Sequence, residues 1–274
     1  MQIAIQGEPG SFSHEAALKF SSQATIFPCA ISQEVFLAVD RRTVDAAVIP
    51  IENSLAGSVV EHYDLLLTHD VAVERELLLR IRHNLIAVPG TRLDQIQRVY
   101  SHPVALAQCR RFFERHPQIE AIPYYDTAGS VKQLAELRDR SSAGIAGAQA
   151  AVHYGGEILE SSIEDNPENY TRFFLIRRRS EAITDPAADK VSLAFTVENR
   201  PGTLVEALQV FAAQGTNLTR IESRPVHGQP WHYVFYADYQ LSSPRSADAA
   251  LALLSRHCSM VKELGRYRSG QKEG

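Results

Sequence analysis

The sequence predicts an α/β protein with two lobes, followed by a smaller domain of a different pattern. Three observations support this prediction. Strand-like and helix-like segments alternate through the first part of the chain, an extended stretch divides the alternation into two sets, and a charged, proline-containing segment precedes a final β-α-β-β-α-β order. Alternation of this kind is typical of a mostly parallel sheet with helices on both faces.

The first lobe is predicted from the segments before residue 70. Its strands read "QIAIQG", "ATIFPC" and "DAAVIPI", and its helices read "SHEAALKFSS", "SQEVFLAVDRR" and "VVEHYDLLLTH". The extended stretch "VAVERELLLRIRHNLIAV" follows and has no helical pattern. We interpret this stretch as the crossover to a second lobe.

The second lobe repeats the alternation. Its strands read "RVYSH", "IEAIPYY" and "AGIAG", and its helices read "PVALAQCRRFFERH", "TAGSVKQLAELRD" and "AQAAVHYG". The apolar strand Phe173–Arg177 then closes this part of the chain. Two α/β lobes with a cleft between them are also the arrangement of periplasmic binding proteins, so the fold alone does not predict catalysis.

The C-terminal domain follows the linker-like segment "RRSEAITDPAADK". Its strands read "KVSLAFTVE", "NLTRIESRPV", "WHYVFYADYQ" and "VKELGRYR", with helices at "GTLVEALQVFAAQG" and "SADAALALLSRH". This β-α-β-β-α-β order is ferredoxin-like. We expect domains at 1–179 and 191–274, a linker at 180–190, and a disordered tail "SGQKEG".

Composition and charge narrow the function classes. The 274 residues carry a formal net charge of −4, which argues against a nucleic-acid-binding surface. No apolar run has the length of a membrane span, and the N-terminus does not resemble a signal peptide. Cys29, Cys109 and Cys258 form no disulfide framework, which favours a reducing cytoplasm.

Small and polar residues follow the predicted strands in four loops. These loops are Gly7–Ser13, Pro50–Ser58, Ser101–Pro103 and Tyr125–Ser130. The carboxyl ends of strands line the ligand crevice of open α/β sheets, and several of these loops lead into helices whose free N–H groups favour an anion. Each loop alone also fits a structural interpretation, because serine and threonine cap helices and glycine and proline shape turns.

Several catalytic motifs are absent from the sequence. It contains no GxSxG nucleophile elbow, no GxGxxG or Walker A loop and no HExxH zinc motif. These absences give no support for a nucleotide or metal cofactor. Glu52 is the carboxylate placed inside a small-residue loop, and Glu8 is a weaker second candidate.

Taken together, these segments resemble the prephenate dehydratase family with a C-terminal ACT domain. The resemblance rests on "GEPGSFSHEAA", "VIPIENSLAGSV", "SHPVALAQC", "DTAGS", "AGIAGAQAA", "ENYTRFFLI", "ENRPGTL" and "NLTRIESRP", in this order. The chain departs from the family pattern at Glu8-Pro9-Gly10 of the first loop. It also has Gly147 in place of a serine, and Thr203 in place of an alanine in the regulatory motif.

The resemblance implies the reaction prephenate → phenylpyruvate + water + carbon dioxide, with no cofactor. It also implies that Thr171, Arg172 and Phe173 belong to the active site. We expect Thr171 to be a positioned hydrogen-bond donor, Arg172 to offer a fork for a substrate carboxylate, and Phe173 to pack beside the ring. Glu52 is either a proton source behind Thr171 or a carboxylate that organises its own loop.

Further residues are expected to bind the substrate or an effector. The substrate-binding candidates are Gly10, Ser11, Phe12, Asn53, Ser54, Gly57, Ser101 and Thr127. The ACT domain implies feedback control by L-phenylalanine in a homodimer or homotetramer, with an effector site at Asn199, Gly202, Thr203, Leu204, Asn217, Leu218, Glu222, Ser223 and Arg224. We also expect a chain that ends near Arg179 to be active but insensitive to phenylalanine.

Three alternatives remain open at this stage. The substrate could be arogenate, the aminated analogue, because the two compounds differ only at the side chain. The protein could be a non-catalytic solute-binding or sensor protein with the same two lobes. The C-terminal domain could bind an effector other than phenylalanine.

Overall fold

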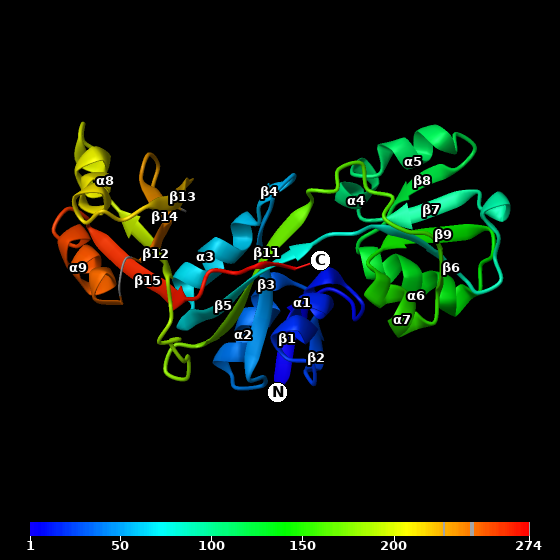
Figure 1. The fold of residues 1–274 in the computed structure, drawn as a ribbon, viewed down its shortest axis with the longest axis horizontal. Helices are drawn as coiled ribbons and strands as arrows, with labels where there is room; N and C mark the ends of the chain where they lie inside the picture. Colours follow the sequence, from blue (N-terminus) through cyan, green and yellow to red (C-terminus); the bar gives the residue numbers. More distant parts are fainter. Residues whose placement is uncertain (227, 242–243, 274) are drawn as a thin grey trace. The chain divides into compact units, whose positions relative to one another are not determined.

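The computed structural model describes residues 1–226, 228–241 and 244–273 (Figure 1). The chain forms two compact units, one made of 1–60, 77–173 and the segment from 272, the other of 61–76 and 174–271. The boundary between the units falls inside two strands, β5 (Val71–Arg80) and β11 (Tyr170–Arg178). Each unit is therefore described by itself.

The first unit contains two α/β lobes. The sheet of the first lobe has the strand order β16-β5-β11-β3-β1-β2, with β4 paired to β3. β1 runs parallel to both β2 and β3, as strand–helix alternation predicts. The remaining elements of this lobe are β1 (Gln2–Gln6), α1 (Phe12–Phe20), β2 (Thr25–Cys29), α2 (Ser32–Asp40), β3 (Ala46–Asn53), β4 (Gly57–Ser58) and β16 (Lys272–Glu273).

The second lobe has a five-stranded sheet in the order β10-β6-β9-β7-β8. β7 runs parallel to β8 and β9, whereas β6 runs antiparallel to β9 and β10. Figure 1 shows α4 and α5 on one side of this sheet and α6 and α7 on the other. The bounds are β6 (Asn84–Ala87), η1 (Leu93–Gln95), β7 (Arg98–Ser101), α4 (Pro103–Ala107), α5 (Arg110–Arg115), β8 (Glu120–Pro123), α6 (Thr127–Leu137), β9 (Ser142–Ala146), α7 (Ala148–Tyr154) and β10 (Glu157–Glu160).

The central strands of the second lobe are buried on both faces. On one face Val99 and Ile145 pack with Phe112 of α5, and on the other Ile86 and Val131 pack with α7. Strands covered on both faces read as continuous apolar runs, as "AGIAG" does here. The two helical layers hold the strand ends, and therefore the loops that follow them, in fixed positions.

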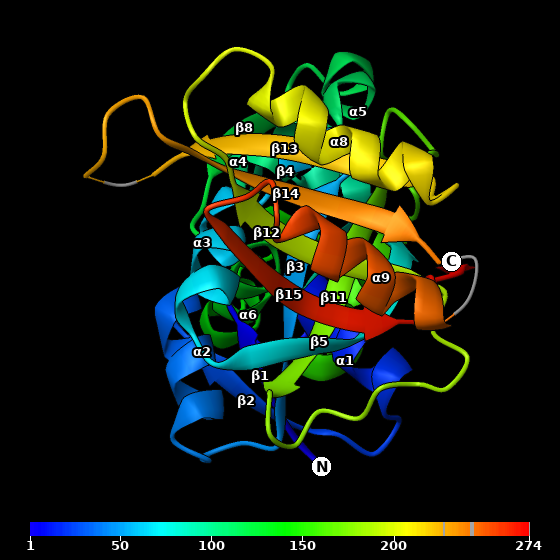
Figure 2. The same ribbon diagram turned by 90° about the vertical axis from the view of Figure 1, so that its left-hand side faces the viewer.

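The second unit contains a four-stranded antiparallel sheet in the order β13-β14-β12-β15. α8 and α9 lie on one face of this sheet (Figure 2). The bounds are β12 (Lys190–Thr196), α8 (Thr203–Ala213), β13 (Leu218–Pro225), β14 (Tyr233–Gln240), α9 (Pro244–Leu254) and β15 (Met260–Tyr267). The predicted β-α-β-β-α-β unit and the two-lobed α/β region are both confirmed.

The helix α3 (Val60–Thr68) also packs in the second unit from residue 61 onward. The Lys262 ammonium donates to the carbonyls of Leu66, Leu67 and His69, at 3.0, 2.8 and 2.8 Å, and so satisfies the free C-terminal end of this helix. Arg224 of β13 donates to the Asp64 carboxylate at 2.9 Å. Lys262 and Arg224 thus bind α3 at two positions, its C-terminal end and Asp64.

Two predicted elements differ from the structure. The single helix expected at 103–116 is divided into α4 and α5, because the Asp165 carboxylate accepts the N–H groups of Arg110 and Arg111 and starts a new helix there. The tail expected to be disordered instead contains β16, whose Lys272 pairs with Leu78 of β5 in parallel register. Residue 274 of that tail lies outside the described residues.

Candidate active site

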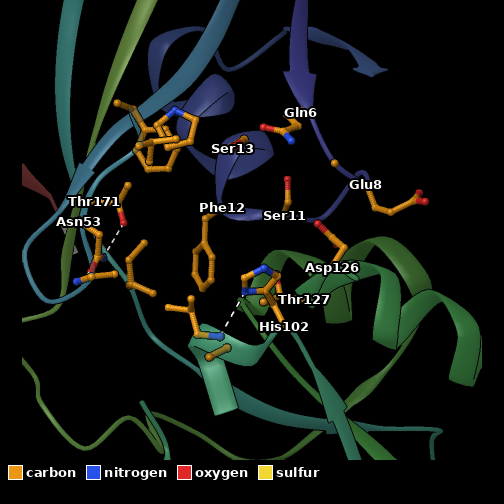
Figure 3. A pocket seen from close by; sticks show the side chains of 18 of the residues that line it. Gln6, Glu8, Ser11, Phe12, Ser13, Asn53, His102, Asp126, Thr127 and Thr171 are labelled. Carbon is orange, nitrogen blue, oxygen red and sulfur yellow. Dashed lines mark hydrogen bonds between the residues drawn. The ribbon is translucent and has the colours of Figure 1, made fainter. Parts of the chain in front are cut away.

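A pocket of about 750 Å³ opens between the two lobes of the first unit. Figure 3 shows Asn53 and Thr171 on one side of this pocket, Asp126 and Thr127 on the other, and the Phe12 ring between them. All four loops predicted to form the crevice contribute lining residues, and the loop Ser101–Pro103 does so through His102. The prediction that polar loops meet at the strand ends is thus consistent with the geometry.

The first loop brings the start of α1 to the pocket, where Ser11, Phe12 and Ser13 line the wall. Ser11 caps α1, and the Gly10 N–H donates to Nδ1 of His14 at 2.8 Å. Gly10 has φ +90°, and a side chain there would lie 2.9 Å from the Ala150 Cα atom. Glycine is therefore required at this position, both for the backbone angle and for the close approach of the second lobe.

The Asn53 side chain holds the second loop against β11. Its Oδ1 accepts the N–H groups of Leu55 and Ala56 at 3.0 and 2.8 Å. Its Nδ2 lies 2.9 Å from Thr171 Oγ1 and 2.8 Å from Asn169 Oδ1. One amide therefore fixes both its own turn and the start of the strand that carries Thr171.

Ser54 joins the same two segments through main-chain atoms. Its hydroxyl donates to the Glu168 carbonyl at 2.9 Å and accepts the Tyr170 N–H at 3.0 Å, and its own N–H donates to the Tyr170 carbonyl at 2.8 Å. Ser54 does not line the pocket, whereas Gly57 of the same loop does. The position of Ser54 indicates support of the loop.

The strand β11 begins at Tyr170, earlier than predicted, so Thr171, Arg172 and Phe173 all lie inside it. Successive side chains of a strand point to opposite faces. Thr171 and Phe173 line the pocket. Arg172, between them, does not line it and is itself buried, with 7% of its surface exposed. The expectation that Arg172 grips a substrate carboxylate is not supported, because strand alternation directs its side chain away from Thr171.

Glu52 and Ser101 are also outside the set of lining residues. Glu52 directly precedes Asn53 on β3, and successive side chains of a strand point to opposite faces, so Glu52 points away from the side on which Asn53 lines the pocket. The Ser101 hydroxyl is fully buried and donates to the Ile145 carbonyl at 2.6 Å. Ser101 thus joins β7 to β9 instead of reaching into the crevice.

The second lobe contributes the start of α6 to the pocket. Thr127 lines the wall, and Asp126 caps the helix by accepting the Gly129 N–H at 2.7 Å. Burial raises the pKa of the Asp126 carboxyl, and the Gly129 hydrogen bond opposes this shift. With α1, this gives the pocket two helix N-termini, each a partial positive charge.

The sequence patterns did not identify His83 and Gln108 as pocket residues. Gln108 follows α4, at the break between α4 and α5, and its Oε1 lies 2.9 Å from His83 Nε2 and 3.0 Å from Asn169 Nδ2. Both His83 and Gln108 line the pocket. The sequence signal that could have pointed to Gln108 is the acidic pair Glu164-Asp165. An aspartate that caps α5 requires the predicted long helix to break, and Gln108 lies at that break.

Glu8 bridges the two lobes. Its carboxylate accepts the Tyr125 hydroxyl at 2.9 Å and the Lys132 ammonium at 3.0 Å. Glu8 and Tyr125 line the pocket, and the pocket-lining residues include no lysine or arginine. An anion in this pocket would therefore be held by neutral donors and helix ends. Among the described residues, no group of three or more His, Cys, Asp or Glu is placed to hold a metal ion.

The effector candidates lie in the second unit. Gly202, with φ +90°, precedes α8, and the Thr203 hydroxyl donates to the carbonyls of Glu198 and Arg200, at 2.6 and 2.9 Å. On β13, Leu218, Glu222 and Arg224 lie on the more buried face, and Ser223 on the exposed face. Asn199 and Leu204 belong to the loop and to α8, and Asn217 donates to the Gln240 side chain at 3.1 Å.

Comparison with known proteins gives two family matches. The sequence profile of the prephenate dehydratase family matches residues 3–181, and the ACT domain profile matches residues 191–238. A curated relative, arogenate dehydratase/prephenate dehydratase 2 of *Arabidopsis thaliana* chloroplasts, is 38% identical over 97% of this chain and 72% of its own length.

Two solved structures cover 98% of this chain. Prephenate dehydratase from *Arthrobacter aurescens*, in complex with L-Phe, has a TM-score of 0.88 and 33% identity, over 90% of its own chain. A structure described as GqqA, a novel type of quorum quenching acylase, has a TM-score of 0.90 and 32% identity, over 98% of its own chain.

Proposed function

Because the chain belongs to the prephenate dehydratase family, we propose that it converts prephenate to phenylpyruvate, water and carbon dioxide in L-phenylalanine biosynthesis. The enzyme is a carbon–oxygen lyase. Loss of the ring hydroxyl and the ring carboxylate makes the ring aromatic, and this drives the reaction without a cofactor. The observation that carries the proposal is the meeting of Thr171 and Phe173 with two helix N-termini in one pocket.

The substrate brings two carboxylates and one hydroxyl into this pocket. We propose that the carboxylates bind the N–H groups at the starts of α1 and α6, because the pocket-lining residues provide no lysine or arginine. The lining residues Ser11 and Phe12 lie at the start of α1, next to the predicted Gly10, which is not itself a lining residue, and Thr127 lies at the start of α6. A ring between these ends would contact the aromatic faces of Phe12 and Phe173.

Thr171 is the group proposed to assist the departing hydroxyl. A threonine hydroxyl is too weak an acid to give up its proton at neutral pH, so its role is to donate a hydrogen bond to the leaving oxygen, and the proton that converts this oxygen to water is taken up from solvent. Glu52 is proposed to organise the loop of Asn53 and Gly57, since it lies outside the pocket-lining set. Arg172 is proposed to stabilise β11 on its other face.

The preferred substrate is proposed to be prephenate, and the closest competing proposal is arogenate. The *Arabidopsis* relative carries both names, so family membership does not distinguish the two. Measuring kcat/KM for both compounds on one preparation tests the choice. A higher value for arogenate would reverse it.

Catalysis itself is tested by the same assay. A pure solute-binding protein would bind one of these compounds without converting it. Hydrolysis of an acylated substrate without loss of prephenate or arogenate would favour the activity named for the similar GqqA structure. Either result would contradict the proposed lyase activity.

Feedback inhibition by L-phenylalanine is proposed for the ACT domain, as the L-Phe complex of the *Arthrobacter* protein suggests by analogy. The N–H groups at the start of α8, after Gly202, would take the effector carboxylate. The segment Asn217–Arg224 would supply acceptors for the ammonium. We propose the division into a catalytic domain at 1–179, a linker at 180–190 and a regulatory domain at 191–274.

The protein is proposed to be a homodimer or homotetramer. β13 is an edge strand of its sheet, and Val205 of α8 and Ile221 of β13 are 58% and 42% exposed. An edge strand with exposed apolar neighbours is suited to pairing with a second copy. Light scattering at several concentrations measures the assembly directly.

A cytoplasmic location is proposed from the three free cysteines. Among the described residues, no helix combines the length and the apolar character needed to cross a membrane. Fractionation of cells that express the protein tests the location.

A further inference from the structure

A chain of side-chain hydrogen bonds leads from Thr171, through Asn53, Asn169 and Gln108, to His83. We propose that Asn169 and His83 are positioning residues, which fix the hydrogen-bond polarity of this chain so that Thr171 and Gln108 both present protons to the substrate. The proposal rests on the proposed dehydratase function. It extends that function by assigning a role to residues that contact no reacting atom.

The orientation of Asn53 is fixed by its own turn. Its Oδ1 accepts two backbone N–H groups, from Leu55 and Ala56. Backbone N–H groups can only donate, so this atom must be the carbonyl oxygen and the other the NH₂ nitrogen. Asn53 therefore donates toward Thr171 and toward Asn169, and Thr171 Oγ1 acts as an acceptor in this bond.

The orientation of Asn53 in turn determines the orientation of Asn169 and of Gln108 in the second lobe. Asn169 is fully buried, and its Oδ1 receives the proton of Asn53. Its NH₂ group must consequently face Gln108, whose Oε1 accepts at 3.0 Å. Gln108 Oε1 is thereby defined as the carbonyl oxygen, and the second contact of that oxygen, with His83 Nε2 at 2.9 Å, requires the imidazole to donate.

His83 is therefore the neutral tautomer with its proton on Nε2. The residue is 2% exposed, and Nδ1 is buried with no hydrogen-bond partner in the part of the chain that the structure describes. Three groups lie around the His83 ring. They are the Gln108 side chain, the Glu164 carboxylate, which accepts the backbone N–H of His83, and the Phe12 ring, which packs against the imidazole in a T-shaped arrangement. Burial lowers the pKa of His83, in agreement with an uncharged ring.

This polarity has a consequence for the pocket. Because Thr171 Oγ1 accepts from Asn53, its own proton remains available, and within the described residues it has no protein acceptor. Because Gln108 accepts through Oε1, its NH₂ group is left for the pocket that it lines. Two donors thus face the substrate from different lobes, one suited to the leaving hydroxyl and one to a carboxylate. A reversed chain would present lone pairs instead.

A matched pair of variants at His83 tests the inference. His83→Gln retains an N–H donor near the position of Nε2, and His83→Met has a similar length but no donor. We expect kcat/KM to fall about 10-fold or more in His83→Met and less than about 3-fold in His83→Gln, since only His83→Met removes one of the two donors that orient Gln108 and leaves Asn169 alone to hold it. Equal losses in the two variants, with equal unfolding temperatures, would reduce His83 to a packing role.

Asn169→Asp tests the middle of the chain, because it replaces the NH₂ donor with an acceptor of the same shape. We expect a loss of kcat/KM of at least about 10-fold in protein that circular dichroism shows to be folded. Wild-type kcat/KM in the folded variant would overturn the proposal. If the variant does not fold, the His83 pair still decides.

The tautomer can be observed without any turnover. Nitrogen-15 NMR of histidine-labelled protein at neutral pH should show the signals of a buried imidazole that is protonated at Nε2 and not at Nδ1, and these signals should be absent from His83→Gln, whereas those of His14, whose Nδ1 accepts the Gly10 N–H, should remain. The opposite tautomer would overturn the inference even in an active enzyme. Conversely, the expected tautomer in a protein that converts neither prephenate nor arogenate would overturn the proposed function alone.

Discussion

Two threonine hydroxyls in different regions of the molecule illustrate how the same group takes different roles. Thr171 lies in the pocket of the first unit, where its oxygen accepts from Asn53 and its proton remains available. Thr203 lies at the start of α8 in the second unit, where its hydroxyl donates to the carbonyls of Glu198 and Arg200. The difference lies in which atom of the hydroxyl is already engaged. A free proton suits chemistry, and an engaged proton suits the closing of a loop.

The largest expected effect is at Thr171. Thr171→Ala should lower kcat by about 10²–10⁴-fold, the scale expected when a donor positioned against the leaving hydroxyl is lost, with little change in unfolding temperature. Steady-state kinetics with prephenate measures the loss. Thr171→Ser keeps the hydroxyl and serves as the control. If the alanine variant kept near-normal kcat, the contrast with Thr203 would disappear.

Phenylalanine control should be the next largest effect. A coupling free energy of about 1–3 kcal/mol is typical between an effector and a distant active site, and it corresponds to a change of about 5–150-fold in affinity. Calorimetry with phenylalanine on the intact protein, followed by inhibition kinetics, measures it. Absence of binding heat at millimolar ligand, with unchanged kinetics, would mean that this domain has a different effector or none.

The ion pair between Asp64 and Arg224 should carry part of that coupling. α3 begins at Val60, immediately after Val59, which lines the pocket. Arg224 of β13 donates a hydrogen bond to Asp64 of α3. We expect Asp64→Asn to weaken phenylalanine inhibition a few-fold and to leave kcat unchanged, because partly exposed ion pairs contribute about 0–1 kcal/mol. An inhibition constant identical to that of the wild type would exclude this link.

Thr203→Ala should have a small effect, which sharpens the contrast with Thr171. The substitution removes the loop hydrogen bonds and restores the residue usual in the family, at a cost of about 0.5–1.5 kcal/mol in stability. We expect phenylalanine affinity to stay within about threefold. A large gain or loss of affinity would show that the hydroxyl contacts the effector.

The weakest expected effect is on the pH dependence of stability. The pKa of His83 is lowered in the folded protein from its usual value of 6.5. Above that value both states are neutral, and as the pH falls below it only the unfolded chain takes up the proton, so stability decreases until the folded pKa is reached. As the pH is lowered from about 7 to 5.5, the unfolding temperature of His83→Gln should therefore decrease less than that of the wild type. Parallel decreases would contradict a buried neutral ring, although the lowered pKa of His14 adds a shared background.

The fold could be predicted in detail because its elements follow local patterns. Strands such as β1 and β9 and the β-α-β-β-α-β order are read from apolar runs and turn residues. The helix break at Gln108 could not be predicted this way. It depends on Asp165, which lies far along the chain and caps α5 through tertiary contact.

The candidate site was predicted less evenly than the fold. Loops that follow strands meet in the pocket, so Ser11, Asn53 and Thr127 were identified correctly as neighbours of one crevice. Arg172 was assigned by its chemistry, whereas its direction is decided by strand alternation once β11 starts at Tyr170. His83 has no local signal, since its contacts to Gln108 and Glu164 join distant segments.

The pairing of β16 with β5 has a consequence for the order in which the protein assembles during synthesis. The first unit contains residues on both sides of a long excursion through the second unit, and β16 reaches its place beside Leu78 and Leu79 only after residues 174–271 have been made. At ordinary translation rates this delay is roughly 5–20 s. Throughout that interval the ribosome-bound chain presents an unpaired β5 edge, an opportunity for chaperones and for mispairing between nascent chains.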